Sequence, residues 1–74
     1  MAEIVKELSG FTGNAVLVRK GEDYFVVSST VALYTGPETL VFPADADGNV
    51  TDWGEVAGGR GVSRGEAIAQ LEQQ

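Results

Sequence analysis

The sequence contains no cysteine and no histidine. Without cysteine there is no disulfide and no thiolate nucleophile, and without histidine the commonest general base is missing. A zinc site is not expected either, because these two residue types supply most zinc ligands. We therefore predict a protein that is not an enzyme and that holds no metal or other cofactor. The absence of cysteine also favours a cytoplasmic location.

Basic residues are few, and long apolar runs are missing. Five Lys and Arg stand against eleven Asp and Glu, which gives a net charge of −6. Phosphate contacts need clustered basic side chains, so we do not predict a nucleic-acid partner. No run approaches the roughly 20 apolar residues that cross a bilayer, so no membrane partner is predicted. Residues 2–8 do not fit a secretory signal, because Glu3, Lys6 and Glu7 interrupt the apolar side chains.

The chain of 74 residues is long enough for a single domain, residues 1–74, and has no room for a second core. Domains of this size bury little apolar surface and are usually reinforced by disulfides, by a metal or by self-association. Since the first two are not expected, self-association and an unusually well-packed core are the remaining possibilities. We favour a homodimer.

Two segments rich in β-branched and aromatic residues predict the first antiparallel hairpin. They are residues 15–20 and 24–31, and the short turn between them contains Gly21. Residues 2–8 are ambiguous, because Ile4 and Leu8 have helical spacing while apolar and polar residues also alternate as in a strand. We favour a strand that pairs with residues 15–20.

A second hairpin is predicted further along the chain. Residues 39–42 form its first strand, which ends near Pro43 because proline cannot donate to a strand ladder. The turn signal of residues 47–49 leads into a returning strand over residues 50–53. The glycines of residues 55–61 predict a connector with little order of its own.

A helix is predicted from Ser63 to about Gln73. Ser63 and Glu66 have the spacing of a capping box, in which the serine oxygen accepts a hydrogen bond from the amide three residues later. Val62 precedes the cap and is placed to pack on Ala67. The apolar stripe of the helix is narrow and consists of Ala67, Ile68 and Leu71.

These elements predict an α+β fold: a small antiparallel sheet of four to five strands, built from two hairpins, with one C-terminal helix packed on one face. Residues 15–18 and 24–27 do not alternate between apolar and polar, so both faces of the first hairpin are apolar. The helix covers one face only. A second copy of the chain is the most economical cover for the other; the alternative is that the N-terminal segment and residues 35–37 fold over it.

Two loops resemble ion-binding motifs without completing them. Residues 45–49 have the acids of a calcium loop, but Pro43 and Gly54 stand where the first and twelfth ligands belong. In residues 54–61, Arg60 and Gly61 replace the lysine and the hydroxyl of a phosphate loop. A turn with solvated acids and a linker are the preferred interpretations. An alternative hypothesis is that Arg60, Arg64 and the amino end of the helix bind an anion.

The single tryptophan and the acidic segment around it are the candidate partner-binding residues. Tryptophan is enriched at binding hot spots, and acidic side chains fit a basic partner surface. For Trp53 itself, packing in the core or in a dimer interface is the preferred interpretation, and a partner-binding anchor is the second. The candidate residues are Tyr34, Asp45, Asp47, Asp52, Trp53 and Glu55.

Four segments resemble the short accessory proteins of actinobacterial tailed phages, a mycobacteriophage-like orphan family. They are GFTGNAVLV at residues 10–18, ETLVFPAD at 38–45, GNVTDW at 48–53 and GGRG at 58–61. The resemblance carries no catalytic or binding residues. It implies a protein made in the host cytoplasm that binds and modulates a host protein. The alternatives are a sponge for an anionic small ligand or nucleotide signal, and a minor structural component of the virion.

Overall fold

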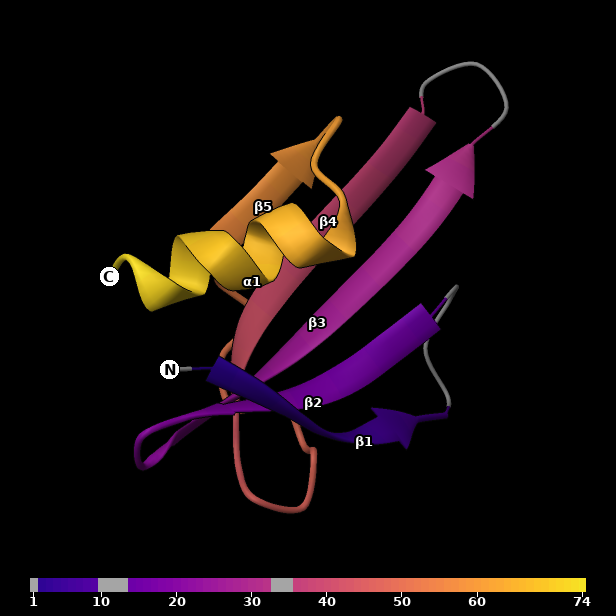
Figure 1. Cartoon of the computed structure of the whole chain (residues 1–74). Coiled ribbons are helices and arrows are strands. Elements are labelled where there is room, and N and C mark those ends of the chain that lie inside the picture. Colours follow the sequence, from indigo (N-terminus) through magenta and orange to yellow (C-terminus); the bar gives the residue numbers. More distant parts are fainter. Residues whose placement is uncertain (1, 10–13, 33–35) are drawn as a thin grey trace.

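The computed structural model describes residues 2–9, 14–32 and 36–74. It confirms the predicted fold class, with a five-stranded antiparallel sheet and one C-terminal helix (Figure 1). The strands follow one another in space as they do along the chain, in the order β1-β2-β3-β4-β5. The elements are β1 (Ala2–Leu8), β2 (Asn14–Lys20), β3 (Asp23–Ala32), β4 (Gly36–Ala44), β5 (Ala57–Arg60) and α1 (Arg64–Glu72).

The predicted hairpin of β2 and β3 is confirmed. Lys20 pairs with Asp23, so Gly21 and Glu22 form a two-residue loop. Gly21 has a φ of 63° and is the one residue of the loop with a positive φ. A glycine with positive φ at the first loop position is typical of a type II′ turn, whose twist matches that of the flanking strands.

The N-terminal segment is a strand, in agreement with the sequence-based expectation. β1 pairs antiparallel with β2, from Ala2 opposite Lys20 to Leu8 opposite Ala15. The register shifts between Ile4 and Lys6, which is a β-bulge. The bulge changes the parity of the strand, so that Ile4 lies opposite Val18 whereas Leu8 shares the face of Leu17.

The predicted strand over residues 50–53 is wrong. Val50 forms only an isolated bridge with Ala44, and the partner of β4 is β5, which lies within the segment that its glycines predicted to have little order. Gly58 makes this pairing possible. It has a φ of 92°, and a Cβ at this position would lie 2.2 Å from the Thr39 carbonyl oxygen. The backbone of β5 therefore approaches β4 in a way that only glycine permits.

The helix α1 begins as predicted. The Ser63 hydroxyl accepts from the Glu66 amide at 3.3 Å and donates to the Glu66 carboxylate at 3.1 Å. At the other end, the Lys20 ammonium donates to the main-chain oxygens of Leu71 and Gln74 at 2.6 and 2.5 Å. The carboxyl end of a helix carries partial negative charge, so the Lys20 cation is stabilised at this position. In the described part of the chain no helix is long and apolar enough to cross a membrane.

The core on the helix side joins α1 to the three central strands. Ala67 and Leu71 of α1 are fully buried against strand side chains, with Val62 and Ile68 at the margin. The Thr39 hydroxyl is buried beneath the start of the helix and donates to the Val62 carbonyl at 2.6 Å. The strand residues of this core are Val16, Val18, Val27 and Val41.

The opposite face of the sheet is covered by the chain itself. Leu17 and Val26 are fully buried, although they point away from the helix-side valines. Part of their cover is the connection of residues 45–56, whose Gly48 packs on Leu8: a Cβ at Gly48 would lie 2.8 Å from Leu8 Cδ2. Leu8 is the contribution of the N-terminal segment, which was the alternative cover. The other part of that alternative, a loop of residues 35–37 folded over this face, is wrong for Gly36 and Pro37, which pair with β3 as the start of β4; Thr35 lies outside the described residues. Burial of this face therefore needs no second copy.

Candidate interaction surface

An open hollow lies where the end of β1 meets the connection between β4 and β5. Its volume is about 580 Å³. One wall comes from the strand end and the other from the turn and the loop that follow β4. The lining residues are Lys6, Glu7, Leu8, Ser9, Asp47, Gly48, Asn49, Val50 and Trp53.

Trp53 is the largest exposed side chain at this hollow. Its indole makes an edge-to-face contact with Phe42, with ring centroids 5.2 Å apart and an interplanar angle of 65°. The backbone on either side is held, because the Thr51 amide donates to the Pro43 carbonyl at 2.9 Å and the Gly54 amide donates to the Asp52 carboxylate at 2.9 Å. Trp53 nevertheless remains 68% exposed. The preferred prediction that Trp53 packs in the core is therefore wrong, whereas a role at an interface is compatible with this exposure.

The carboxylate of Asp45 organises the turn that forms one wall. Its Oδ1 accepts from the amides of Asp47 and Asn49 at 3.0 and 2.9 Å, and its Oδ2 accepts from the Asn49 side chain at 3.3 Å. The hydrogen bond from the Asn49 amide is the main cause that lowers the pKa of Asp45 below its ordinary value. Asp45, a candidate partner-binding residue, is thus engaged within its own turn.

The other acidic candidates differ in position. Asp47 lines the hollow, whereas Asp52 and Glu55 are exposed on the connection beyond it. Tyr34 lies outside the described residues. Trp53 and Asp47 are therefore the two predicted residues that the structure brings together at this surface.

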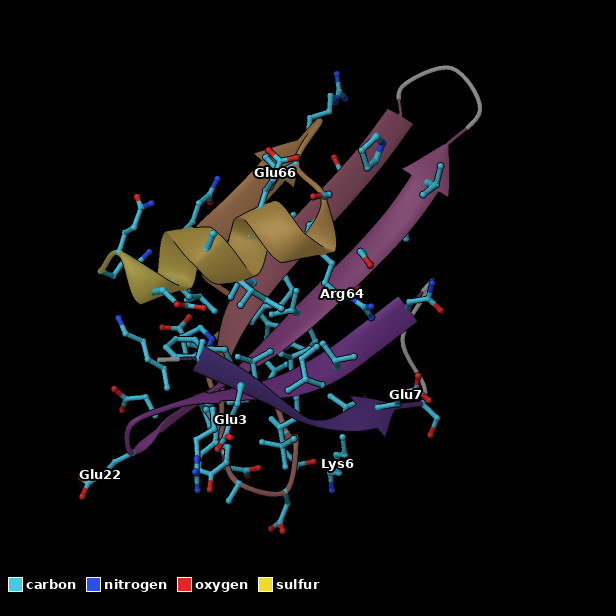
Figure 2. The ribbon with its side chains drawn as sticks, in the orientation of Figure 1. Glu3, Lys6, Glu7, Glu22, Arg64 and Glu66 are labelled. Atoms are coloured by element: carbon cyan, nitrogen blue, oxygen red, sulfur yellow. The ribbon has the colours of Figure 1, made fainter. Side chains whose placement is uncertain are left out.

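Sequence reasoning missed the residues that β1 contributes. Lys6 and Leu8 reach the hollow because the bulge in β1 places them opposite Leu17 and Ala15. No local signal in the sequence marks this bulge. Figure 2 shows Lys6 and Glu7 on this strand, with Glu22 far from them at the β2–β3 turn.

The charges of the hollow are unpaired in the described part of the chain. Lys6, Glu7 and Asp47 are exposed, and no ion pair joins them. The ion pair that the described residues contain is that of Arg19 with Glu3, between β2 and β1. The carboxylate of Asp47 and the ammonium of Lys6 are therefore free to meet a partner at the hollow, whereas the side chain of Glu7, opposite Val16, lies on the helix side of β1.

The two arginines proposed as an anion site do not share a pocket. Arg64 borders a separate hollow of about 320 Å³ together with Glu7, and Arg60, exposed at the end of β5, does not line it. Figure 2 shows Arg64 reaching from the start of α1 toward the sheet. Glu66 lies in the first turn of the helix, where its carboxylate accepts from Ser63. An external anion beside Arg64 would meet the carboxylate of Glu7.

Both open edges of the sheet are protected from pairing with another strand. At β5, the Gly58 amide donates to the Gln70 side chain at 2.8 Å, and the Gln74 side chain donates to the Val56 carbonyl at 2.9 Å. At β1, the bulge and the charged side chains have the same effect. Contact with a partner is therefore expected through side chains.

Comparison with known proteins gives no match to a family model, to a curated protein or to a solved structure. Within residues 2–9, 14–32 and 36–74 there is also no group of three or more acidic side chains that is placed to hold a metal ion.

Proposed function

We propose that this protein is a small interaction module, not an enzyme, that binds and modulates another protein through the surface around Trp53. One observation carries the proposal: a tryptophan held by Phe42 and by flanking backbone hydrogen bonds remains two-thirds exposed beside an open hollow. Exposed aromatic side chains in fixed positions are typical of binding hot spots, because little conformational entropy is lost on binding.

The partner that we propose is a host protein in the cytoplasm of an infected bacterium. The resemblance of the four sequence segments to accessory proteins of actinobacterial phages supports this context. The missing histidine and cysteine support a role without catalysis. The anion sponge is less well supported, because Arg64 lies beside Glu7 and apart from Arg60.

Capture from an actinobacterial lysate tests the proposal. We expect the immobilised wild-type chain to retain one protein at near-stoichiometric level, and the Trp53→Ala variant to lose it. Val31→Ala is the matched control, because Val31 is 82% exposed on β3 and does not line the hollow. Circular dichroism checks folding, since the variant loses the aromatic pair, worth about 0.5–1.5 kcal/mol, in addition to the apolar area that Trp53 buries. Equal capture by wild type and Trp53→Ala would refute the proposed surface.

Self-association remains a separate proposal, which has one support. A chain of 74 residues without disulfides is small enough to benefit from a second copy. An uncovered sheet face no longer supports a dimer, because Leu17 and Val26 are fully buried in the single chain. Any dimer is therefore expected to form through exposed side chains and to be reversible.

A further inference from the structure

We infer that the partner segment presents an arginine, whose guanidinium stacks on the indole of Trp53 and pairs with the carboxylate of Asp47. This inference rests on the proposed function and names the chemistry that the same surface recognises. Both residues line one hollow, so a single side chain entering it can meet both.

The indole of Trp53 is open to a stacking partner. Phe42 contacts it edge-to-face, and most of the Trp53 surface is open to solvent. Tryptophan is the best side chain for binding a cation over its ring face. A partner side chain that stacks there requires no rearrangement of the core beneath.

The charge around the hollow favours a cation. Asp47 lines it together with a single cation, Lys6, and no ion pair among the described residues uses either, while the side chain of Glu7, opposite Val16, lies on the helix side of β1. Asp52 and Glu55 add exposed negative charge on the adjoining connection, and the whole chain carries −6. An acidic segment would be repelled, whereas a basic one is attracted and oriented.

Arginine fits this surface better than lysine. A planar guanidinium stacks on an aromatic ring and also donates two parallel hydrogen bonds to one carboxylate. The Asp47 carboxylate is available for this, because it is the main-chain amide of Asp47, not its side chain, that takes part in the Asp45 turn. A lysine ammonium makes only a point contact. To bind, it must also lose a hydration shell that is held more tightly than that of a guanidinium.

The probe for this inference is a short acetylated and amidated peptide, Gly-Arg-Ser-Gly-Arg-Gly, with counterparts in which lysine or neutral citrulline replaces both arginines. Trp53 is the single tryptophan, so its fluorescence reports binding at the surface in question. We expect a saturable change with the arginine peptide, binding about fivefold weaker with the lysine peptide and none with the citrulline peptide.

Two charge-matched variants locate the contact. Asp47→Asn is expected to weaken arginine-peptide binding about fivefold. Glu22→Gln removes the same charge at the β2–β3 turn, far from the hollow, and is expected to leave binding unchanged (Figure 2). Both residues are exposed, so neither variant should alter the fold.

Several results would overturn the inference. One is the absence of a saturable fluorescence change with the arginine peptide. Another is that the citrulline peptide binds as well as the arginine peptide. A third is that Asp47→Asn and Glu22→Gln weaken binding equally, which would indicate diffuse electrostatic attraction only. A fluorescence change on raising the protein concentration without peptide would show that a second copy occupies the surface. If lysate capture depends on Trp53 but the arginine peptide fails, the partner chemistry is wrong and the proposed function stands. If the peptide binds but nothing is captured, the proposed function fails.

Discussion

At the scale of single residues, the turn after β4 depends on the charge of Asp45. One oxygen of its carboxylate accepts two amides and the other accepts the Asn49 side chain. The acid therefore fixes the loop that carries Asp47 and Gly48, and Gly48 in turn packs on Leu8. A residue that the sequence places in a solvated acidic patch is a structural element of the hollow.

The stability of the protein should depend on the ionisation of Asp45. Its folded-state pKa lies below the ordinary value of 3.8, so the stabilisation is present above that value and is lost as the pH falls through the folded-state pKa. We expect Asp45→Asn to lower the Tm at about pH 7, and the difference from wild type to shrink toward about pH 2. Thermal melts across this range measure it, with Asp47→Asn as the control.

Asp47→Asn is a suitable control because it removes the same charge two positions after Asp45. The carboxylate of Asp47 takes no part in the hydrogen bonds of the turn. If Asp45→Asn and Asp47→Asn give the same Tm profile against pH, the hydrogen bonds of Asp45 do not govern the acid response.

At the scale of elements, β5 and α1 depend on each other. The Gly58 amide donates to Gln70 of the helix, and the Val56 carbonyl accepts from Gln74 just beyond it. Ala57 of β5 also packs at the margin of the helix-side core. The shortest strand of the sheet is thus held both by β4 and by the helix, which explains why a glycine-rich segment of four residues forms a strand at all.

Gly58→Ala is expected to disrupt this arrangement. A Cβ would lie 2.2 Å from the Thr39 carbonyl oxygen, and the φ of 92° is unfavourable for alanine. We expect the free energy of unfolding to fall by at least about 3 kcal/mol, which lowers the Tm by more than about 12 °C in a domain of this size. Thermal melts followed by circular dichroism measure the change.

Gly61→Ala is the matched control, because Gly61 has a φ of 79° and a Cβ added there would meet no atom within 4 Å. It should lose only about 1–2 kcal/mol, the cost of a left-handed alanine. A Gly58→Ala variant as stable as Gly61→Ala would contradict the close approach of β5 to β4.

At the scale of the whole molecule, two cores share one sheet. The helix covers one face, and the 45–56 connection with Leu8 helps to cover the other, so both faces of the central strands are buried within one chain. This arrangement leaves Trp53 outside the core and available for contact. Folding of the single chain and its association with a partner are therefore separate properties that can be tested independently.

The chain should fold without a partner copy. We expect light scattering on a gel-filtration column to give the mass of one chain, 7.8 kDa, at about 10 µM, with any dimer forming only at higher concentration. A dimer mass at the lowest measurable concentration, together with a Tm that rises with protein concentration, would show that the single-chain burial of Leu17 and Val26 is not sufficient for stability.

Local patterns in the sequence determined much of this protein. The β2–β3 hairpin, the capped helix and the α+β class follow from turn residues, β-branched runs and a capping box, which act over a few positions. The two apolar faces of the hairpin could also be predicted, because residues 15–18 do not alternate between apolar and polar side chains. Trp53 and Asp47 could be chosen as candidate binding residues by residue type alone.

Only the tertiary structure decided which segment pairs with β4 and what covers the second face. The predicted turn around residues 47–49 is present, but the chain after it folds over the sheet and does not return as a strand. A glycine-rich segment forms β5 in its place, because Gly58 tolerates the close approach to Thr39. The bulge that brings Lys6 and Leu8 to the hollow likewise depends on pairing with β2. These features depend on contacts between residues far apart in the chain, so no local pattern specifies them.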